Sequence, residues 1–148
     1  LALAADFRIA TPDCEFSVME IKWGLIPDMT GTVTLRELLP LDVAKELTMT
    51  GRRFDALEAE RLHLVTRVSE TPEQAARELA EALLERSPDA VSAAKALFHD
   101  TWNAPEEQAF LRESRLQFKL LRSRNQRTAM NANFKKEIPR FGPRQRDY

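Results

Sequence analysis

Two helix-start signals in the middle of the chain constrain its fold more than any other feature. Thr71-Pro72-Glu73-Gln74 supplies an N-cap hydroxyl, a proline at the first helical position and a glutamine that completes a capping box. Ser87-Pro88 repeats the start of that signal. The second half of the chain is therefore predicted to be helical. The predicted helices run from residue 72 to about 86, from 88 to about 101, from near Pro105, and over about Arg127–Lys136.

The first half of the chain has shorter and more varied patterns, which predict a mixed α/β structure. Alternating apolar residues and β-branched residues predict short strands, and glycine or proline marks the ends of the segments between them. Asp55 with Glu58 three residues later is a variant of the capping box. The predicted elements are a buried helix end at 1–5, strands within 4–10, 15–19 and 64–68, and helices at about 30–39, 42–50 and from Asp55.

Composition allows one domain with a core and leaves the charge unevenly distributed. The chain has 148 residues, 43% of them hydrophobic, and a net charge of −1, which favours neither a polyanionic partner nor a membrane. Residues 112–148, however, hold 11 Lys+Arg against 3 Asp+Glu, a local balance of +8. Such a segment suits an anionic ligand such as a phosphate. It is equally consistent with a solvated helix face that pairs with the acidic remainder of the chain.

Several kinds of site are not supported by the sequence. Cys14 is the only cysteine, which excludes an intrachain disulfide and favours a reducing, cytoplasmic location. His63 and His99 have no second ligand at metal-binding spacing. No serine has a nearby histidine, and the four glycines form no phosphate-binding loop. We therefore expect no metal and no nucleophile, and no apolar run is long enough to cross a membrane.

Two carboxylates in an apolar segment are the strongest candidates for chemistry. SVMEIKWGLIPDMTGT (17–32) places Glu20 and Asp28 among Val, Met, Ile, Leu and Trp residues. A carboxyl group in apolar surroundings has a raised pKa, which suits it to proton transfer near neutral pH, and a second acid in the same cavity adds to the effect. The alternative is structural. Asp28 would cap the following helix, and Glu20 would pair with Lys22 or a neighbouring arginine.

Three segments resemble the crotonase (enoyl-CoA hydratase/isomerase) family. The first, LALAADFRIATPDCEFSVMEIKWGLIPDMTGTVTLREL (1–38), contains the family's L-A-x-x-x-D-x-R-[IV]-A segment, F-x-x-x-E, the G-L-x-P turn and a G-T helix start. The second, TMTGRRFDALEAERLHLVTRV (48–68), resembles the next family block, with His63 in place of the usual glycine. The third, NFKKEIPRF (133–141), resembles the family's terminal motif, matched at Pro139 and Phe141.

The resemblance implies a fold and a division of the chain. It implies an α/β fold, the C-terminal part of a crotonase-like spiral core, followed by a helical region. We expect the spiral core over 1–86 and the helical oligomerisation and CoA-proximal region over 87–148. Assembly as a homotrimer or a hexamer through the C-terminal helices is implied by the same resemblance, with no nucleic-acid or membrane partner.

The resemblance also assigns roles to named residues. Glu20 matches the acid that protonates or deprotonates an acyl carbon, and Asp28 lies eight residues later, where dienoyl-CoA isomerases carry a third acid. The apolar residues that would shape an acyl pocket are Ile21, Trp23, Leu25 and Ile26. The candidates for binding the phosphates of coenzyme A are Lys135, Lys136 and Arg140.

The activity implied is hydration or isomerisation of an enoyl-CoA thioester by enolate-stabilised proton transfer. Coenzyme A would enter as part of the substrate, and no other cofactor is expected. Family members supply the oxyanion donors from segments that precede the position of Leu1, so we expect this chain to be a C-terminal part that is inactive alone. The alternative is a non-catalytic homologue that acts as an oligomerisation or anion-binding module.

Overall fold

The computed structural model describes residues 2–145 of the chain. It divides into two compact units, Leu1–Arg77 and Glu78–Tyr148, and the division falls within the helix α4 (Pro72–Leu84). The functional boundary expected between residues 86 and 87 stays a prediction. Each unit is described separately below.

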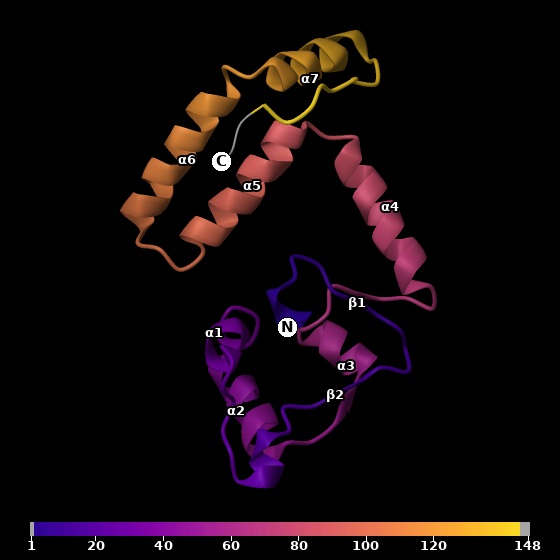
Figure 1. Cartoon of the computed structure of the whole chain (residues 1–148), viewed down its shortest axis with the longest axis vertical. Helices are drawn as coiled ribbons and strands as arrows, with labels where there is room; N and C mark the ends of the chain where they lie inside the picture. The colour runs from indigo at the N-terminus through magenta and orange to yellow at the C-terminus, as the bar shows by residue number, and fades with distance from the viewer. Residues whose placement is uncertain (1, 146–148) are drawn as a thin grey trace. The chain divides into compact units, whose positions relative to one another are not determined.

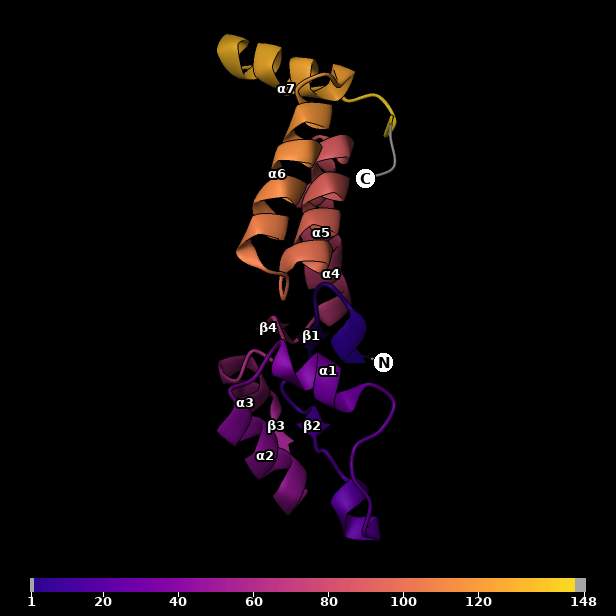
Figure 2. The ribbon, with the colours of Figure 1, turned by 90° about the vertical axis from the view of Figure 1, so that its left-hand side faces the viewer.

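The first unit contains two small pairs of strands (Figure 1 labels β1 and β2, and Figure 2 labels both pairs). β1 (Ile9–Ala10) pairs in parallel with β4 (Arg67–Val68), and β2 (Glu15–Phe16) pairs antiparallel with β3 (Phe54–Asp55). Each ladder spans two residues on each strand, so the strands are shorter than the sequence predicts. A strand needs a hydrogen-bonding neighbour along its length, and each of these described strands has one short partner.

Helices and the strand ends enclose the core of the first unit. Buried apolar residues from both strand pairs and from the helices form one cluster, and Leu47, Ala56 and Ala59 are completely inaccessible to solvent. Phe16 and Phe54 face each other across the β2–β3 pair with their rings stacked at 5.7 Å. The helices of this unit are η1 (Ala2–Ala4) and η2 (Glu20–Trp23), both 3-10 helices, and α1 (Gly31–Arg36), α2 (Leu41–Thr50) and α3 (Ala56–Arg61).

The predicted helix signals of the first unit are confirmed in part. The Asp55 carboxylate accepts a hydrogen bond from the Glu58 N–H at 2.8 Å, as the capping-box variant predicts. Gly51 ends α2 in the left-handed conformation expected of a C-terminal glycine. The prediction at 1–5 is wrong within the described residues, because Ala2–Ala4 is a single 3-10 turn and both of its alanines are exposed.

The second unit is built from helices only within the described residues. α5 (Pro88–Thr101) and α6 (Glu106–Leu120) run side by side in opposite directions, and α7 (Arg124–Lys135) crosses one end of this pair (Figure 2). Ser87 and Ser123 cap α5 and α7 by accepting hydrogen bonds from the N–H groups of Ala90 and Gln126. The start of α5 at Ser87-Pro88 is confirmed, and α7 starts three residues before its predicted position.

A buried polar cluster fixes the segment that follows α7. Asp89 is 0% exposed, and its two carboxylate oxygens accept hydrogen bonds from the Asn125 side-chain amide and the Gln145 N–H, both at 2.8 Å. The Asn125 side chain, 2% exposed, also donates to the carbonyls of Gly142 and Pro143 and accepts from the Gly142 N–H. We call Asp89 and Asn125 the polar clamp. It holds residues 142–145 against α5 and α7.

Candidate active-site segment

Glu20 is the first residue of η2, and its side chain is half-buried. The helix ends at Gly24, whose φ of 70° lies in the left-handed region that glycine adopts without steric cost. The Glu20 carbonyl accepts a hydrogen bond from the Leu25 N–H at 3.1 Å, which closes the turn. The strand predicted at 15–19 is therefore shorter than expected and does not reach Glu20. β2 ends at Phe16, because the partner strand offers only two residues to pair with it.

The segment that leads to Glu20 is fastened to the C-terminal end of α2. The Ser17 hydroxyl donates a hydrogen bond to the Gly51 carbonyl at 3.0 Å. A Cβ atom added at Gly51 would lie 2.6 Å from Cγ2 of Ile21, so Ile21 packs where only glycine leaves room. Gly51 also has a φ of 58°. The glycine that ends α2 therefore positions the start of η2 as well.

The structural alternative for Glu20 is not seen in this structure. Among residues 2–145, the Glu20 carboxylate makes no ion pair with Lys22 or with an arginine. A carboxylate without a fixed partner is available to a bound ligand. The geometry leaves the Glu20 side chain free for the proton-transfer role, which itself stays a prediction.

The predicted acyl-pocket residues lie around η2 and are largely exposed in the described chain. Trp23 and Ile26 are each 79% exposed, Leu25 is 59% exposed and Ile21, which packs on Gly51, is 39% exposed. Met29, 84% exposed, adds a further exposed apolar side chain to this segment, which follows Glu20 in the sequence. Large exposed apolar patches are typical of surfaces that bind a ligand or a partner protein.

Asp28 lies in the turn that precedes α1, and its side chain is exposed. Its carbonyl accepts a hydrogen bond from the Gly31 N–H at 2.8 Å. The residue at the N-cap of α1 is Thr30, and no side-chain hydrogen bond caps this helix. The alternative interpretation of Asp28 as the helix cap is therefore wrong. Neither does a hydrogen bond join Asp28 to Glu20 within residues 2–145.

The turn that holds Asp28 is conformationally strained. Met29 and Thr30 have φ values of 41° and 68°, which place two consecutive non-glycine residues in the left-handed region. A Cβ atom added at Gly31 would lie 2.9 Å from Cβ of Pro27, so the next residue has to be small. Such strain persists only where the surrounding structure requires it, and it is concentrated at ligand sites. It supports a functional role for this turn.

The arginine of the first resemblance motif has a structural role. The Arg8 side chain donates from Nε to the Leu64 carbonyl at 2.7 Å and from Nη1 to the Ala5 carbonyl at 2.7 Å. Its N–H donates to the Thr66 hydroxyl. Arg8 therefore joins the start of β1 to the segment that leads into β4. The sequence alone does not reveal this role, because the two partners lie more than 50 residues from Arg8.

A surface ion-pair network around Arg52 is a second feature that the sequence does not predict. The Arg52 guanidinium donates to both oxygens of Glu46 and both oxygens of Glu58, and it lies over the ring of Phe54. These hydrogen bonds, with that to Glu58 the strongest, raise the pKa of Arg52. The hydrogen bond from Arg52 lowers the pKa of Glu58. The network ties the end of α2 to α3, beside the Gly51 position that supports η2.

The three predicted phosphate-binding residues lie at the end of α7. Lys135 is the last residue of the helix, and Lys136 follows it with a φ of 56° in the left-handed region. Lys135 and Arg140 line one surface hollow of about 370 Å³, together with Thr128, Asn131 and Glu137. The structure brings Lys135 and Arg140 together. Lys136 does not line that hollow.

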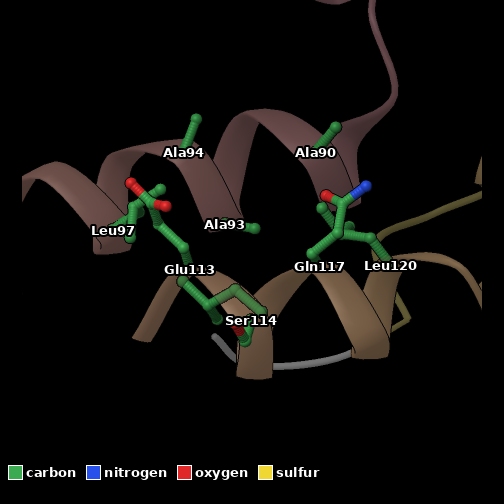
Figure 3. A pocket seen from close by; sticks show the side chains of 9 residues that line it. Ala90, Ala93, Ala94, Leu97, Glu113, Ser114, Gln117 and Leu120 are labelled. Carbon is green, nitrogen blue, oxygen red and sulfur yellow. The ribbon is translucent and has the colours of Figure 1, made fainter. Parts of the chain in front are cut away.

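A groove between α5 and α6 contains none of the predicted site residues. Small side chains on α5 leave a space of about 490 Å³ against α6. In Figure 3, Glu113 and Gln117 reach from α6 toward the alanines of α5. The residues that line the groove are Ala90, Ala93, Ala94 and Leu97 on α5 and Glu113, Ser114, Leu116, Gln117 and Leu120 on α6.

Residues 2–145 contain no group of three His, Cys, Asp or Glu side chains placed to bind a metal ion. No described helix combines the length and the apolar character that crossing a membrane requires.

Solved structures define the class of fold. The chain superimposes with a TM-score of 0.90 on an enoyl-CoA hydratase from Bacillus anthracis, at 30% sequence identity, over 94% of this chain and 55% of that one. It superimposes with a TM-score of 0.89 on an enoyl-CoA hydratase from Mycobacterium tuberculosis, also at 30% identity, over 95% of this chain and 57% of that one. The predicted α/β, crotonase-like fold with a helical C-terminal region is confirmed.

Sequence comparisons give the family. The enoyl-CoA hydratase/isomerase family model matches residues 1–144, and the chain belongs to this family. Carnitinyl-CoA dehydratases from Salmonella typhi and Shigella flexneri are each 40% identical to it over 112 residues, which cover 74% of this chain. The same residues cover 43% of each dehydratase, so the chain spans less than half of the length of these relatives. The resemblance seen in the sequence is confirmed.

Proposed function

We propose that this chain forms part of an enzyme that hydrates, dehydrates or isomerises an enoyl-CoA thioester, with Glu20 as a proton-transfer group. The observation that carries the proposal is the state of Glu20. Its carboxylate is half-buried, lies at the start of η2 beside an exposed apolar surface, and has no ion-pair partner within residues 2–145. The relatives named carnitinyl-CoA dehydratases support a reaction at the acyl carbons of a thioester.

The proposed chemistry follows from the acidity of carbon atoms next to a thioester. Hydrogen bonds to the thioester carbonyl stabilise the enolate that develops when a proton leaves C2, and this is usually the largest electrostatic contribution in such reactions. A positioned carboxylate then accepts the proton or returns it at C2, C3 or C4. Glu20 would perform this transfer, and the backbone contacts of Gly51 and Leu25 would keep its helix turn in place.

Asp28 is the proposed second acid. It lies in the strained turn between η2 and α1, and its side chain is exposed and makes no cap hydrogen bond. A hydratase needs one group to activate water and another to deliver a proton, whereas a simple isomerase can work with one. Asp28 would supply an auxiliary carboxylate, as in the dienoyl-CoA isomerases that the spacing resembles.

Apolar residues of the first unit and basic residues of the second unit are each, taken separately, proposed to contact an acyl-CoA. The acyl chain would contact exposed apolar side chains that follow Glu20 in the sequence, Ile21, Trp23, Leu25 and Ile26. Lys135 and Arg140, which line the same hollow, would bind phosphate oxygens of coenzyme A. Lys136, the next residue after Lys135, is the third candidate. Assembly as a trimer or hexamer belongs to the same proposal.

Replacing Glu20 by glutamine in the intact protein tests the proposal. Glutamine keeps the size of the side chain and removes its ability to carry a proton. We expect turnover of crotonyl-CoA to fall by about 10²- to 10⁴-fold with the thermal stability and the assembly state unchanged. The matched control is Glu15→Gln, which removes the exposed Glu15–Arg53 ion pair five residues earlier and should change turnover by less than about twofold.

The same experiment separates the enzyme from its alternative. A non-catalytic oligomerisation or anion-binding module would lose no function in the Glu20→Gln variant. Equal turnover in the Glu20→Gln and Glu15→Gln variants would overturn the proposed role of Glu20. Loss of turnover together with loss of assembly would show that the side chain is structural.

A further inference from the structure

Arg52 follows the glycine that supports the start of η2, and its side chain joins two helices. Residues 51–53, between α2 and β3, belong to no helix or strand. The Arg52 guanidinium makes four hydrogen bonds of 2.7 to 3.1 Å, two to the Glu46 carboxylate on α2 and two to the Glu58 carboxylate on α3. Exposed ion pairs contribute measurably where the hydrogen bonds are paired or where several charges form a network. The Arg52 contacts meet both conditions.

The backbone around Arg52 is also fixed to the last turns of α2. The Arg52 N–H donates to the Thr50 hydroxyl at 3.3 Å, and that hydroxyl donates to the Glu46 carbonyl at 2.8 Å. The Gly51 N–H donates to the Leu47 carbonyl at 3.1 Å. Gly51 is therefore held by its own hydrogen bond and by a neighbour whose N–H and side chain are both engaged.

A second series of contacts leads from Arg52 to the residues that precede Glu20. The Arg52 guanidinium lies 5.6 Å from the centre of the Phe54 ring, and that ring stacks on the Phe16 ring at 5.7 Å. Phe16 is followed by Ser17, whose hydroxyl donates to the Gly51 carbonyl at 3.0 Å. These contacts form a closed ring of residues, which we call the Arg52 frame: Gly51, Arg52, Phe54, Phe16 and Ser17.

The Arg52 frame contacts the chain on both sides of Glu20. A Cβ atom placed on Gly51 would lie 2.6 Å from Cγ2 of Ile21 and 3.4 Å from the Val18 carbonyl oxygen. Ile21 follows Glu20 directly, and Val18 lies two residues before it. Because no space separates Gly51 from these residues, a displacement of Gly51 displaces the backbone that carries Glu20. A misplacement of about 1 Å can lower the rate of an enzyme by about 10²-fold.

We propose that Arg52 is a positioning residue for Glu20, which acts through the Arg52 frame and not by contact with the substrate. The inference rests on the proposed role of Glu20 as the proton-transfer group. Glu46 and Glu58 accept hydrogen bonds from the same guanidinium, so without it their carboxylates would repel each other and loosen the end of α2 from α3. Arg61, 3.5 Å from Glu58, would offset part of this repulsion, and we therefore expect a moderate loss of rate.

Steady-state kinetics of the intact protein with crotonyl-CoA test this role in a double-mutant cycle. We expect Arg52→Gln to lower kcat about tenfold and to leave KM within about twofold, because the placement of the proton-transfer group changes and substrate binding does not. In the Glu20→Gln background, Arg52→Gln should change kcat by less than about twofold, because no proton-transfer group remains to be positioned. Arg52→Lys keeps the charge without the paired hydrogen bonds and should retain more activity than Arg52→Gln.

The matched control is the neighbouring arginine. Arg53→Gln removes one exposed ion pair with Glu15, and its kcat should lie within about twofold of that of the unmodified protein. Amide chemical shifts of the chain test the geometry independently of turnover. Arg52→Gln should move the shifts of residues 18–23, and Arg53→Gln should leave them in place. Should Arg52→Gln not fold, as judged by circular dichroism, Arg52→Lys replaces it in the same cycle.

The cycle separates a failure of this inference from a failure of the proposed function. Equal losses of kcat from Arg52→Gln with Glu20 present and with Glu20 replaced would indicate a general effect on the fold and overturn the positioning role alone. Equal kcat in the Arg52→Gln and Arg53→Gln variants, or unmoved shifts at residues 18–23 in Arg52→Gln, would overturn it as well. Unchanged turnover in Glu20→Gln itself would instead overturn the proposed function, and the positioning role of Arg52 with it.

Discussion

At position 63 this chain has a histidine where the family pattern has a glycine. The family block that 48–68 resembles has a glycine before Leu64-Val65, and this chain has histidine there. The structure gives the reason for the glycine, because His63 has a φ of 60°, just after the end of α3. Its N–H donates to the Glu60 carbonyl, which fixes this conformation. An L-residue with a Cβ atom pays a steric cost in this region that glycine avoids.

Replacing His63 by glycine should therefore stabilise the protein. We expect a gain of about 1 kcal/mol in the free energy of unfolding, partly offset by the greater freedom of glycine in the unfolded chain. Urea denaturation monitored by circular dichroism measures it. His63→Ala is the matched control, since it removes the ring but keeps the Cβ atom and should give no comparable gain. Equal stability of the alanine and glycine variants would show that the backbone conformation is not the source of strain.

The same kind of reasoning explains which site residues could be predicted. Glu20 is indicated by its apolar neighbours and by the family pattern, and the fold leaves its carboxylate half-buried and without an ion-pair partner in residues 2–145. The role of Asp28 as a helix cap was a reasonable expectation from spacing. It failed because the turn passes through two left-handed residues, so that Thr30 and not Asp28 lies at the N-cap. The spacing of residues in the sequence does not reveal that Met29 and Thr30 adopt the left-handed backbone conformation.

Among the elements, most helix boundaries were predictable, whereas the lengths of the strands were not. A helix is specified by local signals, and Asp55, Ser87-Pro88 and Gly51 each mark a helix boundary that the structure has. A strand depends on a partner from elsewhere in the chain, so its length cannot be derived from its own residues. The predicted strand at 64–68 accordingly shrinks to Arg67–Val68, where β1 provides the partner.

The polar clamp joins elements that no local signal connects, and it yields a test at this scale. Asn125→Ala would remove the amide that donates to the fully buried Asp89 carboxylate and would release the backbone of Gly142 and Pro143. A buried carboxylate that loses a hydrogen bond is left with part of its desolvation cost uncompensated. We expect a loss of about 2 kcal/mol in the free energy of unfolding and faster amide exchange at residues 142–145.

A neighbouring asparagine supplies the control for this experiment. Asn133 lies on the same helix, is exposed, and donates only to the Ala129 carbonyl of its own helix. Asn133→Ala should change stability by less than about 0.5 kcal/mol. Equal effects of the two substitutions, or unchanged exchange at 142–145 in Asn125→Ala, would show that the clamp does not hold the segment.

At the scale of the whole molecule, the chain belongs to a family whose named members are longer. It covers 43% of each carnitinyl-CoA dehydratase that it matches and between 55% and 57% of the two enoyl-CoA hydratase structures described above. The family and the fold were predictable, because the motifs of residues 1–38 are specific and the helix signals are local. The surroundings of Glu20 were not predictable, because the residues that complete a pocket need not be near it in the sequence.

The exposure of the apolar residues near Glu20 leads to a prediction about the isolated chain. Ligand sites enclose roughly 70–90% of a small-molecule ligand, but Trp23 and Ile26 are each 79% exposed here. Within residues 2–145, the proposed acyl-binding side chains are therefore largely open to solvent. Water would remain in contact with the thioester, and the electrostatic stabilisation of an enolate weakens where the effective dielectric constant is high.

We expect the isolated 148-residue chain to hydrate crotonyl-CoA no faster than buffer alone. The loss of the absorbance of the conjugated thioester measures the rate, and a full-length family member assayed in parallel shows that the substrate is competent. Circular dichroism of the same sample must show the helical spectrum, so that inactivity cannot result from unfolding. Hydration above the buffer rate that disappears in the Glu20→Gln variant would contradict this prediction, while supporting the role of Glu20, because it would mean that the described surface suffices to enclose the thioester.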